Sequence, residues 1–517
     1  MHRLTAGGLA LVSVLVGKVS IACRLRRPPE GWRRTVGILL RSQPTRFAVS
    51  AFGLHVPGAS PSDAPNRLQT LAAGALQRYL SRTPDAHFAL EWRREVTTRK
   101  RIPAVDVLLL EFAPNGGLSA LTPFMADTAP AGVRQRAADA IVAAYNATRA
   151  LPEIDRPAAL RAELERRLRS DAPAAACARR LLSATCVSFE GPEAADGRAR
   201  FVPPRFDLRR SLGFGFLTVV MRSTAVATDV DVWVSAHHVG LDGVPLQELV
   251  SGLEREWGSD PAIAFPPPDA DSAFMAPRRC SVDGERAVEE ALGFVDFSPV
   301  IELRRAINRR FADRLREPAT FGAVLAWVLE GEPEFGGVRI ASTVDVAASN
   351  GYERDVDVVP LRPGDFSGAS GRWDAFVDFV NEFNRLVALS RARKSPLRDG
   401  MSTAGLLPAA VHAHVVRSNP PALDDTFGSV CITIIKEAKV FVAPMTDLGL
   451  GHGFFAIGRI DLPAADGSRV GAVSIKGDAG TIAGHHAALR RAIARSATLT
   501  ASLLDRGDSR RPEFEGQ

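Results

Sequence analysis

Two adjacent histidines and an aspartate lie close together in the stretch Val234-Ser-Ala-His237-His238-Val-Gly-Leu-Asp242-Gly243. An imidazole whose pKa is near the working pH can take a proton from an attacking hydroxyl or amine. The spacing brings an imidazole, a carboxylate and a permissive glycine backbone to one short loop. The stretch therefore predicts a catalytic site that uses acid–base chemistry.

The flanking residues predict a strand before this loop and a helix after it. Apolar residues alternate through Val230, Val232 and Val234, which is the period of a strand with one buried face. After the loop, with a helix start at Pro245, apolar residues recur at helical spacing. They are Val244, Leu246, Leu249, Val250 and Leu253. We expect this strand–loop–helix junction to position the histidines.

A purely structural explanation is that His237 and His238 are hydrogen-bonded and cap the strand. The presence of Asp242 and Gly243 at the same junction favours the catalytic interpretation. Five of the other histidines lack acidic or cysteine companions at useful spacing, so we expect packing, surface or turn roles for them and no metal site. They are His412, His414, His452, His485 and His486.

Length and composition indicate a globular protein of at least two domains. The chain has 517 residues, of which 46% are hydrophobic and 24% charged, too many for one hydrophobic core. Its net charge of +6 arises from arginines mixed with acidic residues along helices, which predicts solvated faces rather than a nucleic-acid partner. Five scattered cysteines predict neither disulfides nor zinc and fit a reducing, cytoplasmic location.

The chain divides into two halves of similar size. We expect a leader over 1–32, a first lobe over 33–260, a proline-containing linker over 261–298, a second lobe over 299–505 and a disordered polar tail over 506–517. The apolar part of the leader is shorter than the roughly 20 residues that span a bilayer. We expect it to be amphipathic or partly ordered; a membrane anchor and then a cleaved signal are the alternatives, in that order.

The order of predicted elements in the first lobe recurs in the second. In the first lobe, strands are expected over His87 to Thr97 and Val105 to Phe112, among others. The second lobe has a counterpart of the histidine loop in the segment from Ser474 to Gly484, in which Ala479 takes the place of His238 and Ala483 that of Asp242. The first half therefore has the histidine and the aspartate that acid–base chemistry would use, and the second half lacks both at the matching positions.

The sequence His237-His238-Val-Gly-Leu-Asp242-Gly243 resembles the signature of the chloramphenicol-acetyltransferase-like superfamily. The stretch from Arg33 to Trp257 resembles the acyltransferase (E2) core of 2-oxo acid dehydrogenases, and Gly428 to Thr433 resembles a strand of the same cores. The chain has no recognisable lipoyl domain or subunit-binding segment ahead of this core. The resemblance implies an α/β fold, an α+β two-layer sandwich in each of two lobes that form a pseudo-dimer.

The resemblance also implies an acyltransferase that moves an acyl group from a thioester to a hydroxyl or amine. His238 is then the general base, beside His237; Asp242 holds the loop shape, and Gly243 leaves room at the reacting centre. A hydroxyl from the second half, Thr433 or in its place Ser429, is expected to stabilise the oxyanion.

The implied co-substrate is acyl-CoA or an acyl group on a carrier protein's pantetheine arm, with no bound cofactor and no metal. The residues that bind it remain unknown. The implied partners are a small-molecule acceptor and an acyl carrier protein. Two alternatives stay open: a catalytically silent protein of the same fold that binds an acyl carrier or serves in an assembly, and lipid acylation at a membrane through the leader.

Overall fold

The computed structural model describes most of the chain. The described residues are 38, 47–55, 64–125, 129–152, 155–190, 212–223, 229–241, 243–256, 278–283, 286–336, 339–346, 355–366, 371–392, 394, 407–418, 430–442, 453–463 and 469–508. The predicted leader and 261–277 of the predicted linker lie outside them.

The first lobe is built on a seven-stranded sheet. Its strands lie in the order β14-β1-β8-β7-β6-β4-β5. In chain order they are β1 (Phe47–His55), β4 (Val107–Phe112), β5 (Leu118–Phe124), β6 (Thr185–Glu190), β7 (Leu217–Ser223), β8 (Asp229–His237) and β14 (Val440–Val442). A separate hairpin, β2 (Phe88–Trp92) and β3 (Thr97–Arg101), lies beside this sheet, and Ala89 forms an isolated bridge to Gly215.

Helices cover both faces of this sheet because its strands alternate apolar residues to each side. One apolar cluster joins Val232, Val234 and Ala236 of β8 to α3 (Ala64–Ser81) and α7 (Gly243–Glu256). A second cluster joins β4 and β6 to three helices. These are α4 (Ala131–Thr148), α5 (Arg156–Arg167) and α6 (Ala172–Leu181).

The second lobe has an eight-stranded sheet with helices on one face. Seven strands lie in the order β12-β11-β13-β15-β17-β10-β9, and β16 pairs with β17. They are β9 (Arg278–Asp283), β10 (Arg286–Asp296), β11 (Ile340–Val346), β12 (Asp355–Leu361), β13 (Val430–Ile434), β15 (Gly453–Ile457), β16 (Leu462–Pro463) and β17 (Arg469–Asp478). The helices of its core cluster are α8 (Ser298–Arg310), α9 (Phe321–Glu330), α10 (Arg372–Arg391) and α14 (Ile482–Asp508).

The two sheets repeat the same topology, so the predicted duplication in an α/β fold is confirmed. The path β1-β8-β7-β6-β4-β5 corresponds to β10-β17-β15-β13-β11-β12. In both paths the successive pairings are antiparallel, antiparallel, parallel, parallel and antiparallel. β8 and β17 are therefore equivalent strands, and the turns that follow them are equivalent loops.

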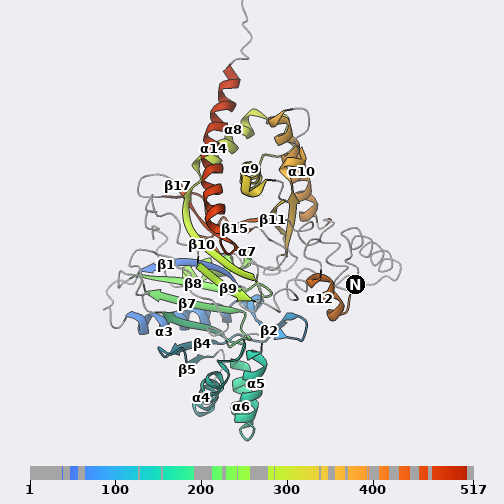
Figure 1. Ribbon diagram of the computed structural model, residues 1–517. Helices are drawn as coiled ribbons and strands as arrows, with labels where there is room; N and C mark the ends of the chain where they lie inside the picture. Colours follow the sequence, from blue (N-terminus) through green and yellow to red (C-terminus); the bar gives the residue numbers. More distant parts are fainter. Residues whose placement is uncertain are drawn as a thin grey trace, which may run out of the picture.

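The lobes are joined by more than the connecting chain. β14 follows β13 of the second sheet in sequence, yet it pairs with β1 at the edge of the first sheet, with Ser50 opposite Phe441. Lys439, just before β14, forms an ion pair with Glu254 of α7 at 3.3 Å. Figure 1 shows the second lobe above the β1 edge of the first sheet, with α4, α5 and α6 at the opposite end.

The structure corrects three of the predicted boundaries. Within the predicted linker, residues 278–283 form β9 and residues 286–296 form β10, two strands of the second sheet. The first lobe does not end at residue 260, because β14 belongs to its sheet. The last helix continues to Asp508, into the predicted tail.

The strand predicted over His87 to Thr97 is also wrong, because the chain turns between β2 and β3. Leu168–Asp171 separates α5 from α6, where the Asp171 carboxylate caps α6 by accepting a hydrogen bond from the backbone N–H of Ala174 at 3.1 Å.

Candidate active site

The predicted strand–loop–helix junction is present at the histidines. β8 ends at His237, residues 238–240 form a turn, and α7 begins at Gly243, two residues before the predicted start. The His237 carbonyl accepts hydrogen bonds from the backbone N–H groups of Gly240 (2.7 Å) and Leu241 (3.2 Å). Val239 and Leu241 are buried in the cluster beneath α7. Backbone hydrogen bonds and apolar anchors therefore fix the turn that carries His238.

His237 is fully buried and electrically neutral. Burial, followed by the neighbouring His238, lowers the pKa of His237 to about 3. Its Nδ1 accepts a hydrogen bond from the backbone N–H of Val239 at 3.3 Å, which places the ring proton of the neutral imidazole on Nε2. His237 therefore supports the turn from inside and is unsuited to exchange protons with a substrate near neutral pH.

His238 is the more accessible of the two histidines. It is the first residue of the turn and is half-buried, whereas His237 has no exposed surface. A side chain at a strand end that retains access is suited to proton transfer, because a general base must reach the group it deprotonates. The neutral neighbour places no positive charge beside His238.

The structure describes only some of the remaining residues predicted for the site. Gly243 is the first residue of α7. Asp242 lies outside the described residues, as do Ser429 and His452. The role predicted for Asp242, like that for Ser429, therefore stays a prediction.

Thr433 lies on the face of the second sheet that is turned away from its helices. Its neighbours Ile432 and Ile434 point into the core of the second lobe, so the side chain of Thr433 points to the opposite face. The partner of Thr433 across β15 is Ala456. Ala456 belongs to the same apolar cluster as Val239, which lies in the turn of His238, and Leu241, which follows that turn. The sheet face that carries Thr433 thus contributes Ala456 to an apolar cluster that it shares with the first lobe and that includes residues of the histidine loop.

Two polar features of this face had no signal in the sequence. The Thr433 hydroxyl is hydrogen-bonded to that of Thr343 on β11, with 2.5 Å between the two Oγ1 atoms. On the same face, Lys476 of β17 and Glu290 of β10 form a buried ion pair with an Nζ–Oε2 distance of 3.3 Å. Thr343, Lys476 and Glu290 reach their partners only through the pairing of strands that are distant in sequence, and no local pattern identifies these three residues.

The equivalent loop of the second lobe has no histidine. β17 ends at Asp478, residues 479–481 form a turn, and α14 begins at Ile482. The backbone N–H of Gly480 donates to the Glu289 carboxylate at 2.9 Å. Asp478 occupies the strand-end position that His237 occupies in β8, and Ala479 follows it as His238 does. Aligning the two loops by the ends of β8 and β17 thus gives the same residue pairs as aligning them by sequence.

Two histidines, His485 and His486, follow this second loop on α14. His485 is buried against the rings of Phe335 and Phe455, with centroid distances of 5.2 and 6.2 Å, which confirms a packing role. Burial, followed by Arg490, lowers the pKa of His486. Among the residues the structure describes, no group of three or more His, Cys, Asp or Glu side chains is placed to hold a metal ion.

A membrane span would need a long apolar helix. None of the helices described here, from α3 to α14, is both long and apolar enough to cross a bilayer.

Comparison with known proteins gives similarity in structure and none in sequence. No protein-family model matches the chain, and no curated sequence matches it significantly. The trichothecene 15-O-acetyltransferase TRI3 from Fusarium sporotrichioides is 9% identical, with a TM-score of 0.46 over 90% of this chain and 93% of that one. TRI101 from F. graminearum, solved with coenzyme A and deoxynivalenol, is 11% identical (TM-score 0.43; 87% and 95% covered). The starter condensation domain of the rhizomide synthetase RzmA is 10% identical (TM-score 0.43; 90% and 92% covered).

Proposed function

We propose that the protein is an acyltransferase in which His238 acts as the general base. The observation that carries this proposal is the difference between the two adjacent histidines at the end of β8. His237 is buried and neutral and accepts a hydrogen bond from the turn, whereas His238 is held on that turn with partial access.

The reaction needs one proton removed and one developing charge stabilised. As the hydroxyl or amine of the acceptor attacks the thioester carbonyl, the imidazole of His238 takes the acceptor's proton. The carbonyl oxygen becomes an oxyanion, which needs a hydrogen-bond donor. When the intermediate collapses, the proton passes to the leaving thiolate, so His238 ends the cycle neutral.

Thr433 is our candidate for the oxyanion donor. Its cross-strand neighbour Ala456, and Ile435 just after its strand, belong to the apolar cluster that includes Val239 and Leu241 of the histidine loop. Because Thr433 shares a single hydrogen bond with Thr343, only one of the two hydroxyl protons is used between them. If Thr343 is the donor in that pair, the proton of Thr433 is left for the oxyanion.

The donor in this proposal is acyl-CoA or an acyl-pantetheine carrier, and the acceptor is a small molecule with a hydroxyl or amine. A panel of acyl-CoA thioesters, offered with and without alcohol and amine acceptors, tests it. We expect thioester cleavage by the wild-type protein and a loss of about 10²- to 10⁴-fold in His238→Ala. A matched control is His486→Ala, which removes another half-buried histidine and is expected to keep the wild-type rate.

Equal rates for wild type and His238→Ala would remove His238 from the mechanism. Thermal melting of both variants belongs to the experiment, because a rate lost together with the fold says nothing about the base. His238 is half-buried on a turn, so we expect His238→Ala to melt within a few degrees of wild type.

A further inference from the structure

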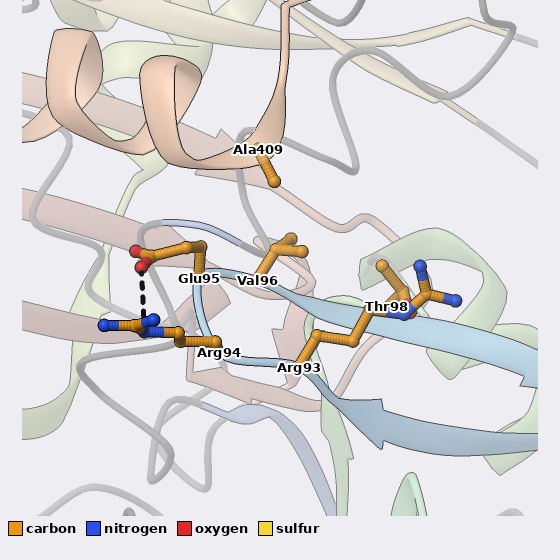
Figure 2. A pocket seen from close by; sticks show the side chains of 6 residues that line it. All are labelled: Arg93, Arg94, Glu95, Val96, Thr98 and Ala409. Carbon is orange, nitrogen blue, oxygen red and sulfur yellow. Dashed lines mark ion pairs between the residues drawn. The ribbon is translucent and has the colours of Figure 1, made fainter.

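A cavity lies between the tip of the β2–β3 hairpin and the start of α12 (Ala409–Arg417). Its volume is about 400 Å³, and one wall comes from each half of the chain. The lining residues are Arg93, Arg94, Glu95, Val96, Thr98 and Ala409. Figure 2 shows Arg94 and Glu95 on one side of the cavity, Arg93 and Thr98 on the other, and Ala409 across from the hairpin.

The cavity combines an apolar surface with charged sides, on which two arginines and one glutamate lie. Val96 is buried and lies between the two charged sides, opposite the methyl group of Ala409. The Arg94 side chain is 96% exposed, and its Nε atom lies 3.7 Å from Glu95 Oε1. That separation exceeds hydrogen-bond distance, and such a surface pair contributes little. The guanidinium of Arg94 is therefore available to a ligand at small energetic cost.

Arg93 is held in place by a neighbouring strand residue. Its Nε and Nη2 atoms donate to Glu91 Oε2 at 3.2 and 2.8 Å. The Arg93 guanidinium, by hydrogen bonding and charge, lowers the pKa of Glu91. The carboxylate thus stays ionised and fixes the orientation of Arg93 beside the cavity.

The hairpin as a whole has more positive charge than its own acids can balance. Residues 88–101 contain five basic and two acidic side chains. Two of the basic groups, Arg99 and Arg101, lie over the Phe88 ring at 4.8 and 5.6 Å from its centroid. A dianion at the cavity offsets more of this excess than a carboxylate does.

We propose that this cavity binds a phosphate group, with the organic part of the ligand lying on Val96 and Ala409. Arginine is suited to this role because its planar fork of N–H donors matches the oxygens of phosphate. The position of the site also relates it to the histidine loop. Trp92 directly precedes Arg93, and its ring packs against His237, so a ligand bound here lies next to the element that supports the histidine loop.

Isothermal titration of the full-length protein with inorganic phosphate and with pyrophosphate, at constant ionic strength, tests the proposal. We expect saturable binding to wild type and about tenfold weaker binding to Arg94→Gln, the loss typical of one charge-assisted contact. Ala409→Phe keeps every charge but fills the cavity, and we expect it to weaken binding to a similar degree. The control is Arg166→Gln, which removes an exposed arginine paired with Glu163 on α5 and is expected to bind as wild type does.

Absence of saturable binding to wild type overturns the proposal. Binding by all three variants that equals binding by wild type overturns it too. Binding that is lost in Arg94→Gln but kept in Ala409→Phe also overturns it, because it indicates diffuse surface charge rather than the cavity.

Coenzyme A is the second arm of the titration. Competition with phosphate, and weakening by Arg94→Gln, identifies the phosphate as that of the acyl donor; phosphate binding without such competition identifies a separate phosphorylated ligand. His238→Ala is expected to bind phosphate normally, so the result stands apart from the proposed catalysis.

Discussion

The indole of Trp92 packs edge-on against the imidazole of His237, with ring centroids 5.9 Å apart and planes at 78°. The indole N–H of Trp92 donates to the carbonyl oxygen of Gly213, so the ring is held from both sides. The β2–β3 hairpin is thereby connected to the strand that carries the candidate base. The phosphate cavity and the histidine loop thus share one supporting contact.

Replacing His237 is expected to lower the free energy of unfolding. His237→Leu leaves the buried backbone N–H of Val239 without its acceptor, at a cost of about 1–3 kcal/mol. His237→Asn places an amide oxygen near the position of Nδ1, and we expect it to recover part of that loss. Urea denaturation of the three proteins measures the difference. Equal values for the Leu and Asn variants would contradict a role for the hydrogen bond.

Lowering the pH is expected to reduce the free energy of unfolding because of the same residue. The folded-state pKa of His237 is about 3, below the ordinary value of 6.5. Between these values the unfolded chain binds a proton that the folded protein excludes. The contribution of neutral His237 to stability is therefore complete above pH 6.5 and is lost as the pH falls towards 3. At about pH 5 the loss is about 2 kcal/mol.

The His237→Asn variant isolates this contribution, because asparagine does not titrate. We expect the stability advantage of wild type over His237→Asn to shrink by about 2 kcal/mol from about pH 7.5 to about pH 5. Denaturation at a series of pH values measures it. A constant advantage over this range would show that His237 is protonated equally in both states.

Thr433→Val is expected to slow thioester cleavage without a matching rise in KM. Loss of an oxyanion donor costs about 10²- to 10³-fold in kcat, whereas Thr433→Ser keeps the hydroxyl and most of the rate. Thr343→Val removes only the hydrogen-bond partner, and its effect on kcat should be smaller. Steady-state kinetics with the best thioester of the panel measures all three; unchanged kcat in Thr433→Val assigns the donor elsewhere.

Removing one partner of the ion pair between Lys476 and Glu290 is expected to lower the stability strongly, whereas replacing both partners is expected to lower it little. The two side chains are 10% and 8% exposed, so Lys476→Met leaves a buried carboxylate without its ammonium, at about 3–5 kcal/mol. The double variant Lys476→Met with Glu290→Leu removes both charges, and we expect it to recover most of that stability. Chemical denaturation measures both proteins.

The exposed pair of Arg385 and Glu382 on α10 is the comparison. Arg385→Met is expected to change stability by less than about 1 kcal/mol. A similar small change in Lys476→Met would mean that water reaches the pair more freely than its burial indicates.

Local patterns predicted the part of the site that lies in one segment of the chain. Alternating valines before His237 and helical spacing after Gly243 were sufficient for β8, the turn and α7. The second loop at Asp478 was found because the duplication repeats the same strand–turn–helix order. These features depend on residues that are neighbours in sequence, where periodicity reports burial directly.

The features that were missed depend on contacts between distant segments. β10 lies within the predicted linker; Glu289 and Glu290 interrupt its apolar residues, and the burial of Glu290 is explained by Lys476 on the neighbouring strand. The turn between β2 and β3 contains Arg93 and Arg94 and no glycine, proline or asparagine, so it lacked the usual turn signal. The pairing of β14 with the first lobe has no local signature, since three residues are too few to show a period.

The strand that the second half contributes to the first sheet also has a consequence for biosynthesis. At ordinary rates of translation, on the order of ten to forty seconds pass between the emergence of α7 and that of Val440–Val442. During that interval the edge of β1 lacks its eventual partner, and an open edge is a template for pairing with other chains. The nascent first lobe is therefore the stage of this protein's life at which we expect chaperones to be needed most.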